Sequence, residues 1–159
     1  MNEQSHEKIT ELIHIAVTAR LYGSNELAGV GVEELCRIYN GIGPESLRPE
    51  VRAKLTKYLH LYEAAAMIHD LSYEQSDGSR EMWRLANAMF LINCLLLSRD
   101  RYAWWNPRRY LAQEAAWLLY YAVESSSGWQ SWQEAKAKRE EREKISGNDA
   151  GKANKEKTK

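Results

Sequence analysis

Two residues that can do acid–base and metal chemistry stand side by side in an otherwise apolar stretch. The segment AAAMIHDLSYEQ, residues 64–75, contains His69 and Asp70, and Tyr73 follows one helical turn later. A neutral imidazole can accept a proton near neutral pH, and a carboxylate is a ligand for hard cations such as Ca²⁺. Neighbouring residues on a helix point about 100° apart. The pair could therefore provide a base and a ligand that face different directions.

The same pattern also has a purely structural interpretation. A histidine on an apolar helix face is more often a hydrogen-bonded core residue than a catalyst. The neighbouring Asp70 favours a functional role, because an unpaired buried carboxylate is costly. Asn87 lies on the apolar stripe of the next predicted helix, between Trp83 and Phe90. A buried asparagine needs hydrogen-bond partners. If the two helices pack antiparallel, His69 is a natural partner, and a bond from Asn87 to the backbone is the alternative.

A glycine loop precedes the His-Asp pair in the sequence. YNGIG, residues 39–43, places Gly41 and Gly43 where the backbone can curl and aim its carbonyls inward. Ca²⁺ is bound by about six to eight oxygen atoms, often backbone carbonyls together with a carboxylate. The loop and Asp70 would supply such a set. A lone G-x-G is common in ordinary turns, so the combination with the His-Asp pair is what indicates a site.

Three elements in this order resemble the phospholipase A2 family, and most of all its compact viral type in parvovirus capsid proteins. The matching residues are Tyr39-Asn40-Gly41-Ile42-Gly43, then His69-Asp70-Leu71-Ser72-Tyr73 after an alanine-rich lead, and then Ala86-Asn87-Ala88-Met89-Phe90. The resemblance covers residues 38–94, roughly a third of the chain. Because small intracellular versions of this domain suit viral entry or release, it also implies a phage or prophage origin and a virion-associated role.

The resemblance implies a Ca²⁺ site made by the loop and the helix. Its ligands would be the backbone carbonyls of Tyr39, Gly41 and Gly43 and the carboxylate of Asp70. Ca²⁺ bound there would act as a Lewis acid and would orient the substrate, rather than generate hydroxide.

The resemblance also implies an activity, which is calcium-dependent hydrolysis of the sn-2 ester of glycerophospholipids at a membrane surface. His69 would be the general base that takes a proton from the attacking water. Tyr73 would hydrogen-bond the polar group that orients His69. The Gly41 N–H, together with the metal, would stabilise the oxyanion.

Asn87 departs from the family pattern, which has Asp at the position that orients the histidine. An amide oxygen can accept a hydrogen bond from the imidazole, but it cannot stabilise an imidazolium by charge. In a serine-protease triad the Asp-to-Asn change lowers the rate about 10⁴-fold, largely through the wrong tautomer. Two functions therefore stay open: an active phospholipase A2, or a catalytically degenerate relative that is a structural or partner-binding scaffold.

The elements that would position these residues are all helical. No segment alternates with period two, and apolar residues recur at helical spacing, which predicts helices over residues 6–21, 49–75, 80–98 and 107–124, a polar one over 129–143, and a short turn over 33–38. Pro49, Ser79 and Asn106 mark helix starts. We expect an all-α fold in which two long antiparallel helices carry the His-Asp pair and Asn87, beside an N-terminal helix, the glycine-rich Ca²⁺-type loop and one or two C-terminal helices.

Length, charge and cysteine content narrow the class of protein. The 159 residues suit one domain, predicted over residues 1–145, while residues 146–159 have too few apolar side chains and are predicted to be disordered. A formal net charge of zero argues against nucleic acid as a partner. The two cysteines, and the lack of a signal peptide or a membrane-spanning run, predict a cytoplasmic protein as made.

An aromatic and basic segment, RDRYAWWNPRRY, lies between the third and fourth of the long predicted helices. It places Trp104 and Trp105 among four arginines. These residues could contact a lipid interface, or they could stack on nucleic-acid bases. We favour a simpler interpretation, in which the tryptophans close the corner between two helices and the arginines are solvated.

Overall fold

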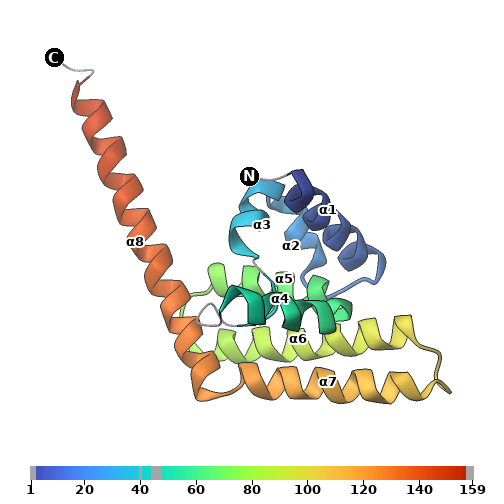
Figure 1. Ribbon diagram of the computed structural model, residues 1–159. Coiled ribbons are helices and arrows are strands. Elements are labelled where there is room, and N and C mark those ends of the chain that lie inside the picture. Colours follow the sequence, from blue (N-terminus) through green and yellow to red (C-terminus); the bar gives the residue numbers. More distant parts are fainter. Residues whose placement is uncertain (1–2, 40, 44–47, 157–159) are drawn as a thin grey trace.

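The computed structural model describes residues 3–39, 41–43 and 48–156, and all regular structure in these ranges is helical (Figure 1). The predicted all-α class is confirmed. In chain order the elements are α1 (Glu3–Thr18), α2 (Ser24–Gly29), α3 (Val32–Ile38), α4 (Pro49–Tyr58), the 3-10 turn η1 (His60–Tyr62), α5 (Glu63–Glu74), α6 (Arg80–Arg101), α7 (Pro107–Val123) and α8 (Ser126–Glu156).

The predicted continuous helix over residues 49–75 is wrong, because it is divided into α4, η1 and α5. No glycine or proline marks the break. Tyr62 in η1 is buried, and its hydroxyl donates to the Ala112 carbonyl and lies 3.2 Å from the Ser98 hydroxyl. We attribute the tighter turn to these contacts with α6 and α7. The His-Asp pair consequently lies on a 12-residue helix.

Other helix boundaries differ less from the prediction. The glycine-rich region between α1 and α4 contains α2 as well as the predicted short turn, which is α3. Gly23 begins α2 from a left-handed conformation, with φ of 87°. α6 ends three residues later than predicted, and α8 begins at Ser126 and continues to Glu156. The division into a domain over residues 1–145 and a disordered tail over 146–159 stays a prediction.

α5 is the central helix, because other helices pack against it from several directions. α1 and α3 contact it on one side and α6 on another, while α6 and α7 lie side by side along the base of the molecule (Figure 1). Eight of the twelve residues of α5 are buried, so a polar side chain on this helix must find a partner or line a cavity. The surrounding core includes Leu12, Ala16, Leu27, Leu35, Met67, Ile68, Phe90 and Cys94.

The first half of α8 is fastened to the corner between α5 and α6, and the rest of the helix extends away from the other helices (Figure 1). Trp132 is fully buried against Trp83 and Tyr73. Gln133 donates to the Gly78 carbonyl at 2.9 Å, and Arg139 donates to the backbone of Glu74 at 2.7 Å. Among the described residues, no helix combines the length and the apolar character needed to span a bilayer.

Candidate active site

The histidine and asparagine expected to face each other are in contact. His69 on α5 and Asn87 on α6 are 7% and 0% exposed. Nε2 of the imidazole lies 2.9 Å from Oδ1 of the amide. The two helices are held in this register by a short turn, in which Ser79 caps α6 by accepting from the N–H of Met82. The histidine is therefore a hydrogen-bonded buried residue, and the question is what its other nitrogen does.

The remaining bonds of Asn87 fix the direction of its amide. Nδ2 donates to the Glu124 carboxylate at 3.2 Å and to the Val123 carbonyl at 3.4 Å. The Tyr73 hydroxyl donates to Oδ1 at 3.4 Å. An amide oxygen only accepts hydrogen bonds, so His69 Nε2 must carry a proton. The lone pair then resides on Nδ1, which is the nitrogen that can act as a base.

His69 and Asp70 both line a cavity of about 550 Å³. Nδ1 of His69 lies 4.0 Å from Oδ1 of Asp70, which is too far for a direct hydrogen bond. Its lining is mixed: the apolar part includes Ile38, Ile42, Leu55, Ala66, Phe90, Leu119, Ala122 and Val123, and the charged part includes Arg37, Glu74, Glu134, Lys138 and Arg142. A proton acceptor and a carboxylate thus share a partly apolar cavity wide enough for a small molecule or an acyl chain.

The glycine loop reaches the same cavity. Gly41 and Gly43 line it, and their φ angles of 105° and 116° are accessible mainly to glycine. A Cβ at Gly41 would meet the Thr56 hydroxyl at 2.8 Å. That hydroxyl accepts from the N–H of Ile42 at 2.8 Å and so anchors the loop to α4. Thr56 was not among the predicted site residues, because no spacing connects a threonine on one helix to the loop.

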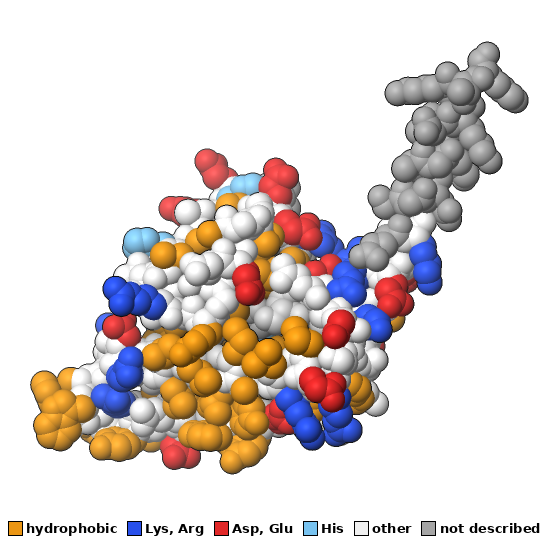
Figure 2. All heavy atoms as spheres, turned by 180° about the vertical axis from the view of Figure 1, so that it is seen from behind, with side chains coloured by type: hydrophobic (Ala, Val, Ile, Leu, Met, Phe, Trp, Pro, Cys, Tyr) orange, Lys and Arg blue, Asp and Glu red, His pale blue; other side chains and the backbone are white. Residues whose placement is uncertain are grey.

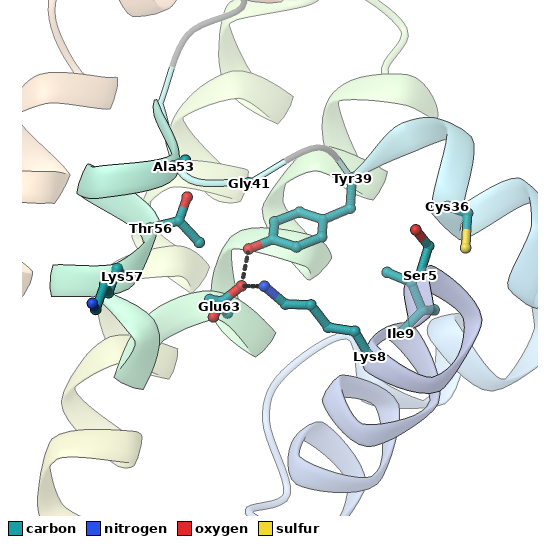
Figure 3. A pocket seen from close by; sticks show the side chains of 10 residues that line it. All are labelled: Ser5, Lys8, Ile9, Cys36, Tyr39, Gly41, Ala53, Thr56, Lys57 and Glu63. Atoms are coloured by element: carbon teal, nitrogen blue, oxygen red, sulfur yellow. Dashed lines mark hydrogen bonds and ion pairs between the residues drawn. The ribbon is translucent and has the colours of Figure 1, made fainter. Parts of the chain in front are cut away.

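Tyr39 is placed differently from the other predicted residues. Its side chain lines a separate cavity of about 400 Å³, together with Lys8, Thr56 and Glu63 (Figure 3). There its hydroxyl donates to Glu63 at 3.0 Å, and Lys8 pairs with the same carboxylate. Burial and the Glu63 charge hold the pKa of Tyr39 above its usual range. The predicted ligand is the backbone carbonyl of Tyr39, which stays a prediction; Asn40 and residues 44–47 lie outside the described residues.

The donor atoms available here suit a hard cation. In the part of the chain that the structure describes, no group of three or more His, Cys, Asp or Glu side chains could hold a metal ion, so a cation would depend on backbone carbonyls. Asp70, which is 35% exposed, supplies a carboxylate at the cavity. Gly41 and Gly43 both have positive φ angles, a backbone conformation that glycine adopts readily. An all-oxygen set of this kind fits Ca²⁺ better than a thiolate-binding metal.

Burial sets the protonation states of the side chains around the base. It lowers the pKa of His69 to about 4, although the bond to Asn87 opposes the shift. Burial also raises the pKa of Tyr73, so its hydroxyl stays a donor at neutral pH. The imidazole ring lies 4.4 Å from the ring of Tyr73 and 4.7 Å from that of Phe90. At pH 7 His69 is therefore neutral and held in place by its neighbours.

Besides Thr56, two further parts of the site could not be found from the sequence. Glu124 lies 37 positions after Asn87, and the only signal was that a buried asparagine needs partners. α8 supplies a wall of the cavity through Ser131, Ala135 and neighbouring residues. Its Trp132 packs edge-on against Tyr73 at 4.6 Å. The sequence predicted only a polar helix here, and its composition gave no indication of that contact.

The aromatic and basic corner between α6 and α7 is more exposed than expected. Trp104 and Trp105 are 72% and 69% exposed and pack mainly edge-on against each other, so the interpretation that they close the corner is wrong. Figure 2 shows apolar side chains gathered over the base of the molecule. The exposed large apolar side chains of α7 are Tyr110, Leu111, Trp117, Leu118 and Tyr121.

Comparison with known proteins gives no match to a family model, to a curated protein or to a solved structure. The likeness to the phospholipase A2 family therefore depends on the three sequence elements alone. The geometry of His69, Asn87 and the loop is an observation independent of that likeness.

Proposed function

We propose that this chain is a calcium-dependent, phospholipase A2-like esterase that hydrolyses the sn-2 ester of glycerophospholipids. The observation that supports it is the meeting of two separate parts of the chain, α5 and the glycine loop, at one cavity. The base, His69, lies beside Asp70, and the glycines of the YNGIG loop line the same space. These are the positions that the family resemblance assigns to the general base and to the Ca²⁺ ligands.

In the proposed reaction His69 acts through Nδ1. Asn87 keeps the proton on Nε2, so Nδ1 has the lone pair that takes a proton from the attacking water. Tyr73 and Phe90 limit rotation of the ring. The apolar part of the cavity wall would accommodate the acyl chain of the ester.

Ca²⁺, when bound, would supply Lewis-acid stabilisation of the developing oxyanion. The residues that would hold it are Asp70, through its carboxylate, and Tyr39, Gly41 and Gly43, through their carbonyls. The N–H of Gly41 would donate to the same oxyanion. The anchor between Thr56 and Ile42 would keep the loop in place, because it ties the backbone between the two glycines to α4.

We further propose that the corner between α6 and α7 contacts the lipid surface. Tryptophan rings partition to the headgroup region, and arginines favour anionic headgroups. Trp104 and Trp105 are exposed there, and the same segment contains Arg99, Arg101, Arg108 and Arg109. Sedimentation with vesicles that contain phosphatidylserine should detect binding that the paired Trp104→Ala and Trp105→Ala changes weaken.

A second candidate is a catalytically degenerate relative that is a structural or partner-binding scaffold. The observation in its favour is that His69 contacts an amide where the family has a carboxylate. Burial also lowers the pKa of His69 to about 4, which makes it a weak base. The phage or prophage origin and the virion-associated role belong to either candidate.

Release of fatty acid from mixed phospholipid micelles separates the two candidates. We expect release by the wild type that requires free Ca²⁺ and falls by about 10²–10⁴-fold in His69→Gln, the usual contribution of a general base. His14→Gln is the control, because His14 is exposed on α1 and should leave the rate unchanged. A wild type that releases no fatty acid at any Ca²⁺ concentration would overturn the proposed activity and leave the scaffold as the remaining candidate.

A further inference from the structure

The imidazole of His69 and the carboxylate of Glu124 are joined through Asn87. Nε2 donates to Oδ1 at 2.9 Å, and Nδ2 of the same amide donates to Glu124 Oε1 at 3.2 Å. Glu124 is the C-cap residue of α7, and its own N–H is bonded to the Tyr120 carbonyl at 2.9 Å. We propose that Glu124 is the positioning residue of this site: it fixes the direction of the Asn87 amide and thereby the tautomer of His69.

The argument begins with the two directions that the amide can take. In the observed direction Nδ2 faces two acceptors, the Glu124 carboxylate and the Val123 carbonyl. After a flip, Oδ1 would face both of those oxygens, and Nδ2 would face the Nε2–H of His69. Asn87 is fully buried, so water could not satisfy these groups. The carboxylate of Glu124 is charged and accepts the shorter of the two hydrogen bonds, so it contributes most to the preference for the observed direction.

The direction of the amide decides which imidazole nitrogen is the base. With Oδ1 toward the ring, the proton stays on Nε2 and the lone pair of Nδ1 faces the side of Asp70. With Nδ2 toward the ring, Nε2 would have to accept, and the proton would move to Nδ1. Proton abstraction at Nδ1 would then be lost. This inference deepens the proposed function and rests on it for the role of His69 as a base.

The same geometry explains why an amide is compatible with this position. An aspartate at residue 87 would place two carboxylates about as close as the present contact of 3.2 Å, and like charges at that distance do not both ionise readily. Asn87 separates the single negative charge of Glu124 from the imidazole by one hydrogen-bonded group. Asn87 and Glu124 are therefore a matched pair, in which the charge lies on α7 instead of α6.

The first test reads the tautomer directly, without calcium or substrate. The full chain, labelled with ¹⁵N-histidine, is examined at pH 7.5 through two-bond ring correlations. We expect a protonated Nε2 in the wild type and in Glu124→Gln, which keeps an acceptor. In Glu124→Ala we expect a mixture that includes protonated Nδ1. Glu114→Ala, on the exposed side of α7, is the matched control. A wild-type pattern in Glu124→Ala would overturn the proposal.

The second test is a double-mutant cycle on thermal unfolding at pH 7.5. Asn87→Asp alone should lower the melting temperature, because it brings two carboxylates together. Adding Glu124→Gln should restore most of the loss, so that the double variant melts well above the single one. Strictly additive effects would contradict the matched pair. This cycle also covers the case in which Glu124→Ala does not fold.

Fatty-acid release by the same variants keeps the two hypotheses distinguishable. If the tautomer and the cycle behave as expected but the wild type releases no fatty acid, the proposed function fails and the positioning role stands. If the wild type is active and Glu124→Ala keeps both its rate and its tautomer, the positioning role fails alone. We expect an active wild type, loss of rate in Glu124→Ala and recovery in Glu124→Gln.

Discussion

His69 makes the folded protein sensitive to acid, because its burial disfavours the protonated ring. Its pKa is about 4 in the folded protein and near 6.5 in an unfolded chain. Between these values the unfolded chain binds a proton that the folded protein does not. The free energy of unfolding therefore falls as the pH drops from about 6.5 to about 4, whereas above 6.5 this residue adds no pH dependence. The full shift corresponds to roughly 3 kcal/mol.

This prediction is checked by urea unfolding at pH 7.5 and at pH 4.5. The wild type should lose more stability between the two pH values than His69→Gln, whose side chain does not titrate. The difference between the two losses should be roughly 2–3 kcal/mol. Equal losses of stability would show that folding does not lower the pKa of His69.

A single side chain, the carboxylate of Asp70, would anchor the proposed metal. We expect Ca²⁺ at millimolar concentration to raise the melting temperature of the wild type, since binding to the folded state alone adds about 2.7 kcal/mol at 100 times the dissociation constant. Asp70→Asn should abolish the shift. Asp100→Asn is the matched control, because Asp100 is exposed on α6. A wild type that calcium does not stabilise would rule out the loop as a metal site.

How far the site could be predicted depends on how its residues are connected in sequence. Two apolar stripes on consecutive helices predicted the contact between His69 and Asn87 as one of two alternatives, the other being a bond from Asn87 to the backbone. Glu124 follows from no pattern, because it approaches from the end of α7 through the tertiary fold. Thr56 is likewise an ordinary helix residue until the loop lies against it.

At the scale of elements, helix starts were easier to predict than a helix break. Ser79 and Asn106 accept hydrogen bonds from the first turns of α6 and α7, as their residue types indicate. The break between α4 and α5 has no such local signal. It depends on the bonds of Tyr62 to residues 36 and 50 positions away, which periodicity cannot show.

Gly41 in the glycine loop should not tolerate a side chain. Gly41→Ala would place a Cβ against Thr56 in a backbone conformation that favours glycine. We expect a loss of about 1–3 kcal/mol in unfolding free energy, together with loss of stabilisation by Ca²⁺. Gly29→Ala is the control, because Gly29 ends α2 with open space around it. Chemical denaturation with and without Ca²⁺ measures both effects, and equal stabilities of the two variants would contradict the anchored loop.

For the molecule as a whole, α8 determines whether the site is complete. Trp132 is fully buried and contacts Tyr73, which in turn contacts His69. Trp132→Ala should therefore lower the unfolding free energy by about 3–5 kcal/mol, and it should reduce fatty-acid release because Tyr73 loses its support. Trp104→Ala, at an exposed position, should change stability by less than about 0.5 kcal/mol. Equal effects of the two changes would show that α8 does not pack as described.

The attachment of α8 has a consequence for synthesis on the ribosome. When α1 to α6 have emerged, His69 and Asn87 can already meet, but Glu124 and the wall formed by α8 are still inside the exit tunnel or not yet translated. The cavity closes only after about the last turn of α7 and the first half of α8 leave the exit tunnel. A nascent chain therefore contains His69 without the complete cavity around it. Under the proposed function, a ribosome-bound or prematurely terminated product would be harmless to the membranes of the cell that makes it.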